Sequence, residues 1–281
     1  MLQINWKLKA ALYKILFIFK LEKILFFIQK KITKRAKIDI NETKHYWKHH
    51  LKYLRSYKSN NIIEFGAGKS LEQNIYLNYQ FDNNLSQTVI DLSYMLDINL
   101  FNEANKQIAK LLNVNKKPHV KNIDDIRNLF SIQYFAPCDI KEIENKKMFF
   151  DACISSATLE HLSLKQLSDT FLRLKKIIKK DGIISSLIDY SDHYSHTDRN
   201  IGPLNFLKFD QNEWKKFNNL YFFQNRFRHQ DYRNFFLKHN FEILEEIKGT
   251  IGKPPKKISN IFDTSDNETY ILWGHFLLKN I

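Results

Sequence analysis

Short apolar runs alternate with longer amphipathic segments from residue 60 onward. Runs of strand length occupy residues 61–65 and 88–91, and further runs occupy residues 149–155 and 183–189. Between the last two, the spacing of apolar residues predicts a helix over Ser163–Lys179. Alternation of this kind predicts an α/β fold in which helices cover both faces of a mostly parallel sheet.

The end of the chain adds two more predicted strands. They occupy residues 241–247 and 270–278. Residues 250–268 between them contain Pro254 and Pro255, which interrupt regular structure. This stretch is therefore predicted to be a loop.

Residues 1–58 are predicted to form an N-terminal helical extension, followed by a single domain over residues 59–281. Residues 10–28 are apolar enough to suggest a membrane span, but four charged residues interrupt them: Lys14, Lys20, Glu22 and Lys23. Each charge at the centre of a bilayer costs about 2.5–3.5 kcal/mol, which disfavours a span. A signal peptide is disfavoured because the stretch lacks a small-residue cleavage site. We favour a helix packed on the main domain or on a sister subunit, with a helix lying on a membrane surface as the alternative.

The composition narrows the classes of protein. The 281 residues include 44 Lys and Arg against 30 Asp and Glu, a formal charge of +14, and 43% are hydrophobic, which excludes wholesale disorder. Two cysteines cannot make a disulfide framework, so a cytoplasmic setting is expected. The lysine pairs are scattered along the chain, and we therefore interpret the charge mainly as solvated surface. Attraction to nucleic acid, anionic lipid or a nucleotide-linked substrate is the weaker interpretation.

The first predicted strand ends in a glycine turn, EFGAGKS, over residues 64–70. Glycines at such a turn let the main chain approach a ligand closely, because no Cβ intervenes. Asp91 ends the next predicted strand, where its carboxylate can accept both hydroxyls of a ribose. Gly66, Gly68 and Asp91 are therefore predicted to form a cofactor site.

From this turn onward the sequence resembles the class I S-adenosylmethionine-dependent methyltransferases. Residues 64–70 resemble their first motif, with Ser70 in place of the third glycine, and VIDLS at 89–93 resembles their acidic second motif. FFDACISSATLEHLS at 149–163 is similar to the fourth-strand segment of the large group that includes quinone-biosynthesis methyltransferases. LKKIIKKDGIISSLIDY at 174–190 resembles the helix, glycine turn and fifth strand that follow.

This resemblance implies a Rossmann-like sheet of seven strands and S-adenosyl-L-methionine as cofactor. Between Asp91 and Asp139 lie more residues than compact members carry, so a helical insertion is expected over the cofactor side. Asp139 lies in a segment similar to the one whose carboxylate receives the adenine amino group. The residues that the resemblance assigns to the cofactor are Glu64, Gly66, Ala67, Gly68, Asp91, Leu92, Asp139 and Ser156.

Beyond the fifth predicted strand comes a polar run, DYSDHYSHTD, over Asp189–Asp198. Ligands of open α/β sheets bind outside the carboxyl ends of the strands, which places this run at the mouth of the pocket. It resembles a D-H-Y-x-H-x-D run of uncharacterised methyltransferases associated with surface-polysaccharide and glycan modification. A later pattern, here spread over residues 205–232, extends that resemblance. The predicted acceptor contacts are Tyr190, Asp192, Asp198, Arg226 and Arg228.

Transfer of a methyl group to oxygen requires removal of a proton, and imidazole is suited to that task near neutral pH. His161, His193 and His196 are the candidate bases. The carboxylates and imidazoles of the 189–198 segment offer a second interpretation, a Mg²⁺ ion that orients a diol. A third is that they only make loop hydrogen bonds. We favour a metal-free site. Arg226 and Arg228 are interpreted either as a clamp on an anionic acceptor or as surface charge.

The predicted function is O-methylation of a small or glycan-linked acceptor. A nucleic-acid methyltransferase is the first alternative, but residues 154–158 read ISSAT and lack the prolines typical of base-modifying enzymes. The second alternative is a non-catalytic scaffold that retains the fold, against which the intact cofactor motifs argue. Residues 1–30 are expected to be dispensable for methyl transfer, with peripheral contact at the inner face of the membrane as a further expectation.

Overall fold

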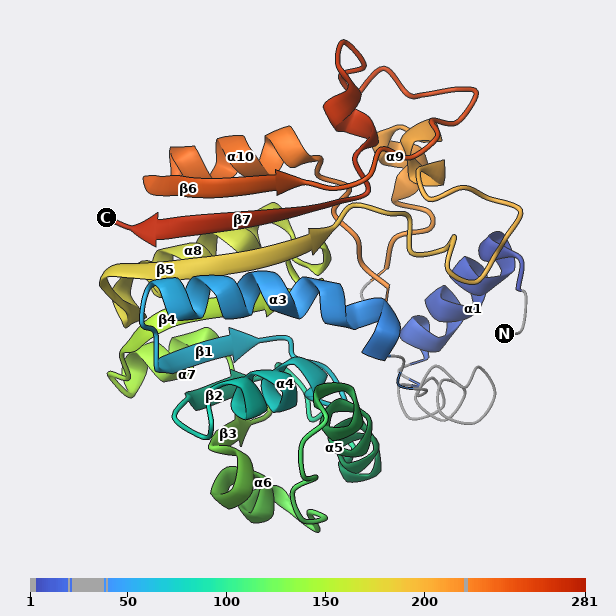
Figure 1. Ribbon diagram of the computed structural model, residues 1–281. Coiled ribbons are helices and arrows are strands. Elements are labelled where there is room, and N and C mark those ends of the chain that lie inside the picture. Colours follow the sequence, from blue (N-terminus) through green and yellow to red (C-terminus); the bar gives the residue numbers. More distant parts are fainter. Residues whose placement is uncertain (1–3, 20, 22–37, 39, 220–221) are drawn as a thin grey trace.

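The computed structural model describes residues 4–19, 21, 38, 40–219 and 222–281. Seven strands form one sheet in the order β3-β2-β1-β4-β5-β7-β6 (Figure 1). The sheet is parallel except for β7, which runs antiparallel to both β5 and β6. The strands are β1 (Asn61–Phe65), β2 (Ser86–Ile90), β3 (Ile132–Phe135), β4 (Phe150–Ser156), β5 (Ile178–Asp189), β6 (Phe241–Lys248) and β7 (Trp273–Asn280).

Helices cover both faces of this sheet, as the alternating pattern predicts. Side chains along a strand point to opposite faces in turn, so Ile62 enters one apolar core and Ile63 the other. The first core is closed by α3 (Ile40–Ser56), α4 (Glu72–Gln80), α5 (Ile98–Leu112) and α6 (Ile123–Phe130). The second is closed by α7 (Ile140–Asn145), α8 (Leu164–Ile177) and α10 (His229–Lys238).

Helix α3, which the sequence assigned to the N-terminal extension, packs into the core of the sheet. Trp47 and Leu54 of this helix lie in the first core with Ile62 and Ala152 of the sheet. The predicted insertion between Asp91 and Asp139 is helical, since it forms α5 and α6. Helix α5 packs on α4, and only its start approaches the cofactor side, where the Asp97 N–H donates to the Lys69 carbonyl at 2.9 Å.

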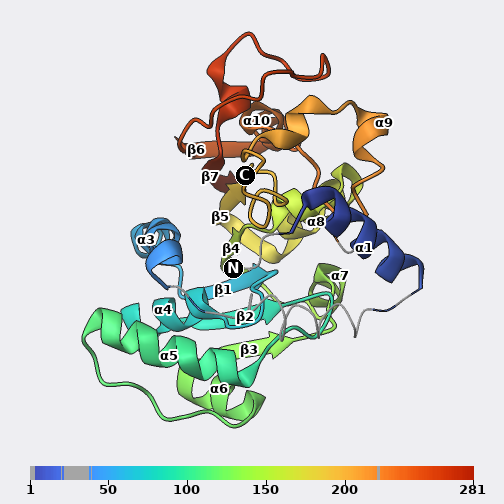
Figure 2. The same ribbon diagram turned by 90° about the vertical axis from the view of Figure 1, so that its right-hand side faces the viewer.

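Helix α1 (Trp6–Ile18) lies across the carboxyl edge of the sheet, which Figure 2 shows face on. It packs through Trp6 and Ala10 on a third apolar cluster that includes Tyr194 and Trp214. The favoured interpretation, a helix packed on the main domain, therefore holds for residues 6–18. Residues 22–28 of the predicted helix lie outside the described residues.

The outer face of α1 is apolar as well. Leu8, Leu12 and Ile15 are exposed there, so contact with a membrane surface stays a prediction. Among the helices that the structure describes, none has both the length and the apolar composition needed to span a bilayer.

Irregular chain covers the carboxyl edge beyond β5. It contains the short helices η3 (Asn205–Lys208) and α9 (Gln211–Trp214), and a last short helix, η4 (Asn267–Tyr270), precedes β7. Residues 250–266 form the predicted loop, apart from one isolated bridge between Ile251 and Ile271. The residues that the sequence singled out for chemistry converge on this same edge.

Candidate functional site

The turn after β1 has the backbone that its glycines suggest. Gly66 and Gly68 have φ angles of +76° and +79°, in the left-handed region that favours glycine. A Cβ on Gly66 would lie 2.5 Å from Cγ2 of Thr158, whereas one on Gly68 would meet no atom within 4 Å. Gly66 thus packs against the segment after β4, and Gly68 faces open space at which a ligand can approach the main chain.

Asp91 follows β2 beside this turn. Its side chain is buried, and its Oδ2 has no hydrogen-bond partner among the described residues. Burial raises the pKa of Asp91 to about 6, although a hydrogen bond from Tyr134 opposes the rise. A buried carboxylate oxygen without a donor fits a ligand that brings hydroxyl donors, such as a ribose.

Glu64 and Ser156 support the turn from below. The Glu64 carboxylate is buried and accepts hydrogen bonds from Gln73 at 3.0 Å and Asn74 at 2.7 Å. Burial raises the pKa of Glu64 to about 8. The Ser156 hydroxyl donates to Oε1 of Gln73 at 2.7 Å. Both side chains are thus hydrogen-bonded within the protein, and the direct cofactor contacts predicted for them stay predictions.

Three further predicted cofactor residues lie at the rim. Leu92 is 66% exposed beside Asp91, and Ala67 is half-buried in the glycine turn. Asp139 caps the first turn of α7, where its carboxylate accepts from the Lys141 N–H at 2.8 Å. The adenine role of Asp139 stays a prediction, and it would use a carboxylate that also serves as a helix cap.

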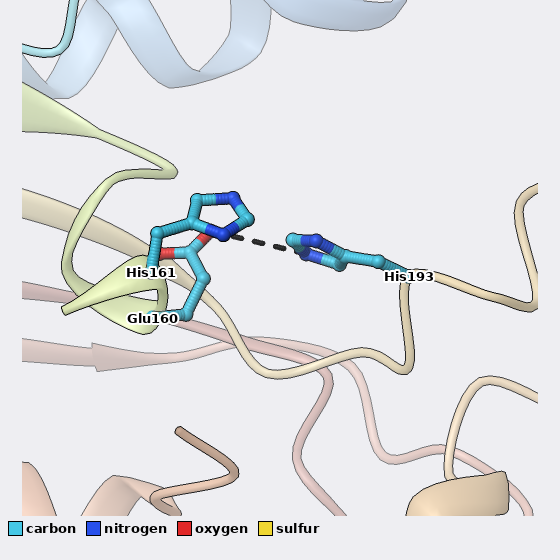
Figure 3. Close-up of side chains that lie close together, drawn as sticks. All are labelled: Glu160, His161 and His193. Carbon is cyan, nitrogen blue, oxygen red and sulfur yellow. Dashed lines mark ion pairs between the residues drawn. The ribbon is translucent and has the colours of Figure 1, made fainter. Parts of the chain in front are cut away.

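A second group forms where the ends of β4 and β5 meet. The short helix η2 (Leu159–His161) follows β4 and carries Glu160 and His161, and the loop after β5 carries His193 (Figure 3). One ligand-type atom of each of the three lies within 4.8 Å of those of the other two. Nε2 of His193 lies 3.3 Å from Oδ2 of Asp189 and 4.0 Å from Oε1 of Glu160. We refer to Glu160, His161, Asp189 and His193 as the carboxylate–imidazole cluster.

The two carboxylates of this cluster differ in ionisation. Glu160 is 2% exposed, and neither of its carboxylate oxygens has a side-chain hydrogen-bond partner among the described residues. Burial, and then the charge of Asp189, raise the pKa of Glu160 well above its ordinary value. Burial also opposes ionisation of Asp189, but hydrogen bonds from His193 and Ser191 hold its pKa below the ordinary value.

Three consecutive residues, 223–225, hold the cluster in place. The Phe223 carbonyl lies 2.8 Å from Nδ1 of His161, Oε1 of Gln224 accepts from the His193 N–H at 3.3 Å, and the Asn225 N–H donates to the Glu160 carbonyl at 2.9 Å. A carbonyl only accepts, so Nδ1 of His161 carries the proton and Nε2 of the neutral ring keeps its lone pair. Although part of this ring faces solvent, the surrounding protein and then His193 lower its pKa.

No family model and no curated protein matches the chain. Solved structures do. The 1,6-didemethyltoxoflavin N1-methyltransferase of Burkholderia thailandensis, with bound S-adenosylhomocysteine, gives a TM-score of 0.50 at 12% identity, over 90% of this chain and 84% of its own. The magnesium protoporphyrin IX methyltransferase of Synechocystis gives 0.49 at 9% identity, over 92% and 99% of the two chains.

The chain has a methyltransferase fold. This confirms the class I fold that the motifs imply, with the mixed sheet described above. Likeness at so low an identity concerns the fold alone, so the acceptor has to be argued from the residues of the site.

Asp192 and Asp198, both predicted to contact the acceptor, bond to other parts of the protein around the loop after β5. Asp192 is buried and accepts from the Tyr194 N–H at 2.9 Å and from Asn205 at 3.0 Å. Asp198 accepts from the Trp6 N–H at 2.9 Å, at the first turn of α1. Both carboxylates are thus bonded to donors of the protein itself, and the acceptor contacts predicted for them stay predictions.

The other predicted acceptor contacts also point inward. Arg226 and Arg228 are buried, so they form neither a surface charge nor a free clamp. Arg226 donates to the carbonyls of Phe206 and Phe209, and Arg228 donates to the carbonyls of Tyr190, Thr269 and Ile271. The Tyr190 hydroxyl is buried beside Nδ1 of His229 at 3.1 Å. The residues of the 225–232 pattern therefore pack beneath the loop that follows β5 and bond to main-chain carbonyls around it.

His196 differs from the other candidate bases. Its ring is exposed, stacks on His193 with 5.2 Å between the ring centroids, and lies 3.2 Å from the Ser191 hydroxyl. It borders the cluster through His193 and is not among the three residues whose ligand atoms lie within 4.8 Å of one another. Sequence reasoning chose His161 from its motif and missed the adjacent Glu160, although an acid next to a candidate base was the available signal.

A basic depression of about 460 Å³ lies at the opposite edge of the sheet. It is lined by Lys175, Lys176, Lys179, Lys180, Phe149, Ile178, Asn280 and Ile281. These residues lie near the amino ends of β4 and β5, away from the glycine turn. The depression is therefore not part of the candidate site.

Proposed function

We propose that the chain is an S-adenosylmethionine-dependent methyltransferase that acts on a hydroxyl of a small or glycan-linked acceptor. The observation that carries the proposal is the buried, unpartnered Oδ2 of Asp91 beside the open side of Gly68. A site that keeps a carboxylate oxygen buried without a donor is poorly explained by folding alone, since most buried polar atoms are paired.

The residues present fit this cofactor. When bound, S-adenosylmethionine would supply a methyl group on a sulfonium, whose carbon–sulfur bond breaks as the bond to the acceptor oxygen forms. Asp91 would accept hydrogen bonds from ribose hydroxyls, and the main chain at Gly68 leaves room for close approach. Leu92 offers an exposed apolar side chain at the rim against which a purine can pack.

The carboxylate–imidazole cluster would activate the acceptor. Methyl transfer releases the proton of the hydroxyl, and the free Nε2 of His161 or the imidazole of His193 can receive it. Asp189, 3.3 Å from His193, is placed to stabilise a charged imidazole. A glycan-linked acceptor is supported by the resemblance of the 189–198 segment, and an oxygen acceptor by this pairing of histidines with a carboxylate.

Calorimetry with S-adenosylmethionine and S-adenosylhomocysteine tests the cofactor assignment. Asp91→Ala should weaken binding by about 1–3 kcal/mol, because it removes the partner of ligand donors. Asp169→Ala, which removes an exposed carboxylate of helix α8 outside the predicted site, is the control. Absence of cofactor binding by the folded wild-type chain would refute the proposal.

Methyl-labelled cofactor, incubated with nucleotide sugars and glycan extracts, tests the acceptor. Once an acceptor is found, His193→Ala should lower turnover about 10²–10⁴-fold with little change in cofactor affinity. Full turnover in the double variant His161→Ala/His193→Ala would remove the cluster from the reaction.

A further inference from the structure

The Glu160 carboxylate is unexplained by the fold. It is buried, has no side-chain hydrogen-bond partner among the described residues, and faces two imidazoles. A buried carboxylate without a charged or side-chain donor is costly, and proteins usually pair such a group or neutralise it. Nε2 of His193 lies 4.0 Å from Oε1 of Glu160 and 3.3 Å from Oδ2 of Asp189, so an imidazole nitrogen and two carboxylates converge on one place.

The spacing of these atoms suits a shared cation. Carboxylate oxygens and imidazole nitrogens bind a divalent metal at about 2.0–2.2 Å, which sets neighbouring ligand atoms about 3.0–3.5 Å apart. Here Nε2 of His193 lies 4.0 Å from Oε1 of Glu160 and 3.3 Å from Oδ2 of Asp189. The ligand atom of His161 lies within 4.8 Å of those of Glu160 and His193. Side-chain rotations that shift the ligand atoms by about 1 Å would bring these separations into that range.

Hydrogen bonds within the protein already hold the proposed ligands in place. Residues 223–225 bond to Glu160, His161 and His193, as described above. The Asn225 side chain also donates to the carbonyls of Leu159 and Leu162 at 2.9 Å. The hydrogen bond from Nδ1 of His161 leaves Nε2 as the metal-binding nitrogen. Such second-layer contacts orient metal-binding histidines and increase their basicity.

We propose that Glu160, His161 and His193, with Asp189 as the fourth ligand, form a site for a first-row divalent transition-metal ion. Two imidazoles select such ions over Mg²⁺ and Ca²⁺, which prefer oxygen ligands. The sequence alone favoured a metal-free site and drew the alternative ligands from residues 189–198. In the proposed site, Glu160 and His161 take the place of Asp192, His196 and Asp198 from that set, since these two carboxylates are bonded elsewhere and His196 is not part of the group.

The proposal deepens the proposed function and depends on it for the reaction, but not for the binding of the ion. An acceptor hydroxyl that binds the ion becomes more acidic, because the positive charge stabilises the alkoxide. The released proton then passes to solvent, and the two histidines serve as ligands instead of as the base. The proposed ion site lies next to the cofactor turn, because Thr158, two residues before Glu160, contacts that turn at Gly66. An acceptor bound to the ion would therefore lie near the cofactor.

Titration calorimetry of the full-length, metal-free chain with Co²⁺, Mn²⁺ and Zn²⁺ tests the site. We expect one ion per chain, with Mg²⁺ unable to compete, and Co²⁺ should give the absorption bands of a nitrogen- and oxygen-ligated ion. Glu160→Gln and His193→Ala should each weaken binding by more than about 100-fold, beyond the effect of losing an outer contact. His119→Ala, which removes an exposed histidine far from the cluster, should leave binding unchanged.

Thermal unfolding gives a second readout that does not depend on turnover. Glu160→Gln should raise the Tm of the metal-free chain, because it removes an unpaired buried carboxylate, and it should abolish the rise in Tm that the ion gives the wild type. No binding by a folded wild-type chain, or binding that Glu160→Gln leaves unchanged, overturns the site. Cofactor binding in that case keeps the proposed function, whereas ion binding without cofactor binding keeps the site and removes the function.

Discussion

Nδ1 of His50 on helix α3 lies 2.8 Å from the hydroxyl of Ser185 on strand β5. The direction of this hydrogen bond follows from its neighbours. Ser156 gives its proton to the amide oxygen of Gln73, so Nε2 of His50, 3.0 Å away, donates to Ser156. Nδ1 of His50 therefore accepts from Ser185, which in turn accepts from Nε2 of His275 at 2.8 Å.

All donors in this buried chain thus point the same way. It runs from His275 on β7, through the centre of the sheet, to Gln73, whose amide donates to Glu64 under the cofactor turn. This series of hydrogen bonds joins α3 to β4, β5 and β7. Helix α3, which precedes the glycine turn in the sequence, therefore helps to hold Gln73 and Glu64 under that turn.

Ser185→Ala should lower the free energy of unfolding by about 1–3 kcal/mol, because it leaves Nδ1 of His50 and the Nε2–H of His275 buried without partners. Urea unfolding followed by circular dichroism measures the loss. The control is Ser186→Ala on the same strand, which removes a hydroxyl bonded to Ser155 at 3.0 Å. An equal loss of unfolding free energy in the two variants would contradict the proposed series of hydrogen bonds through Ser185.

His50 should also make stability depend on pH. Burial, and then His49, lower the pKa of His50 to about 3. Its pKa in the unfolded chain is near 6.5, so on acidification the unfolded state takes up the proton first, and the folded state loses stability from about pH 6.5 down towards pH 3. Relative to His50→Gln, the wild type should lose about 1.4 kcal/mol per pH unit below 6.5. Urea midpoints at pH 7, 6 and 5 check this, and parallel curves for the two proteins would exclude it.

Cofactor affinity should fall in acid because of Asp91. Burial raises the pKa of this carboxyl to about 6, and only the ionised form accepts from two ribose hydroxyls. Below about pH 6 the affinity for S-adenosylmethionine should drop by up to about tenfold per pH unit. Calorimetry between pH 5 and 7.5 measures it, and Asp91→Asn should bind weakly with a flat profile. A wild-type profile that is equally flat would separate Asp91 from the ligand.

Asp198→Ala should loosen helix α1, because Oδ2 of Asp198 satisfies the Trp6 N–H at the start of that helix. We expect a lower urea midpoint and faster proteolysis between residues 6 and 18, with Asp198→Asn intermediate because its amide oxygen still accepts. Unchanged proteolysis in the alanine variant would count against this contact. The dispensability of residues 1–30 stays a prediction, and the packing of Trp6 and Ala10 on Tyr194 and Trp214 indicates that deleting α1 would uncover these two side chains.

Local patterns were enough for most of the sheet. Residues 61–65 are recognisable as a strand because a short, mostly apolar run, buried over its last four residues, is followed by the glycine turn. Strand β3 escaped detection because it has four residues and only alternate ones are buried. The place of Asp91 directly after strand β2 could also be predicted, because the apolar run at 88–90 marks the end of that strand. Its role at the cofactor stays a prediction.

The acceptor side was harder to predict because its residues depend on distant partners. A loop carboxylate such as Asp198 has the same local sequence whether it faces a ligand or bonds to an N–H 192 residues away. Arg228 is buried by carbonyls about 40 positions along the chain in both directions. Glu160 became informative only when the fold showed that its carboxylate is buried without a side-chain partner next to His193.

Among its hydrogen bonds, the loop after β5 is joined to α1 through Asp198 and to Gln224 through His193. Anything that steadies α1, including a surface resting on its exposed Leu8, Leu12 and Ile15, therefore also steadies the loop that presents His193. Linkage makes such an effect reciprocal: an acceptor that orders the loop must tighten the grip of α1 on that surface by the same factor. Binding of the acceptor and binding of helix α1 to a surface would then each change the affinity of the other without direct contact.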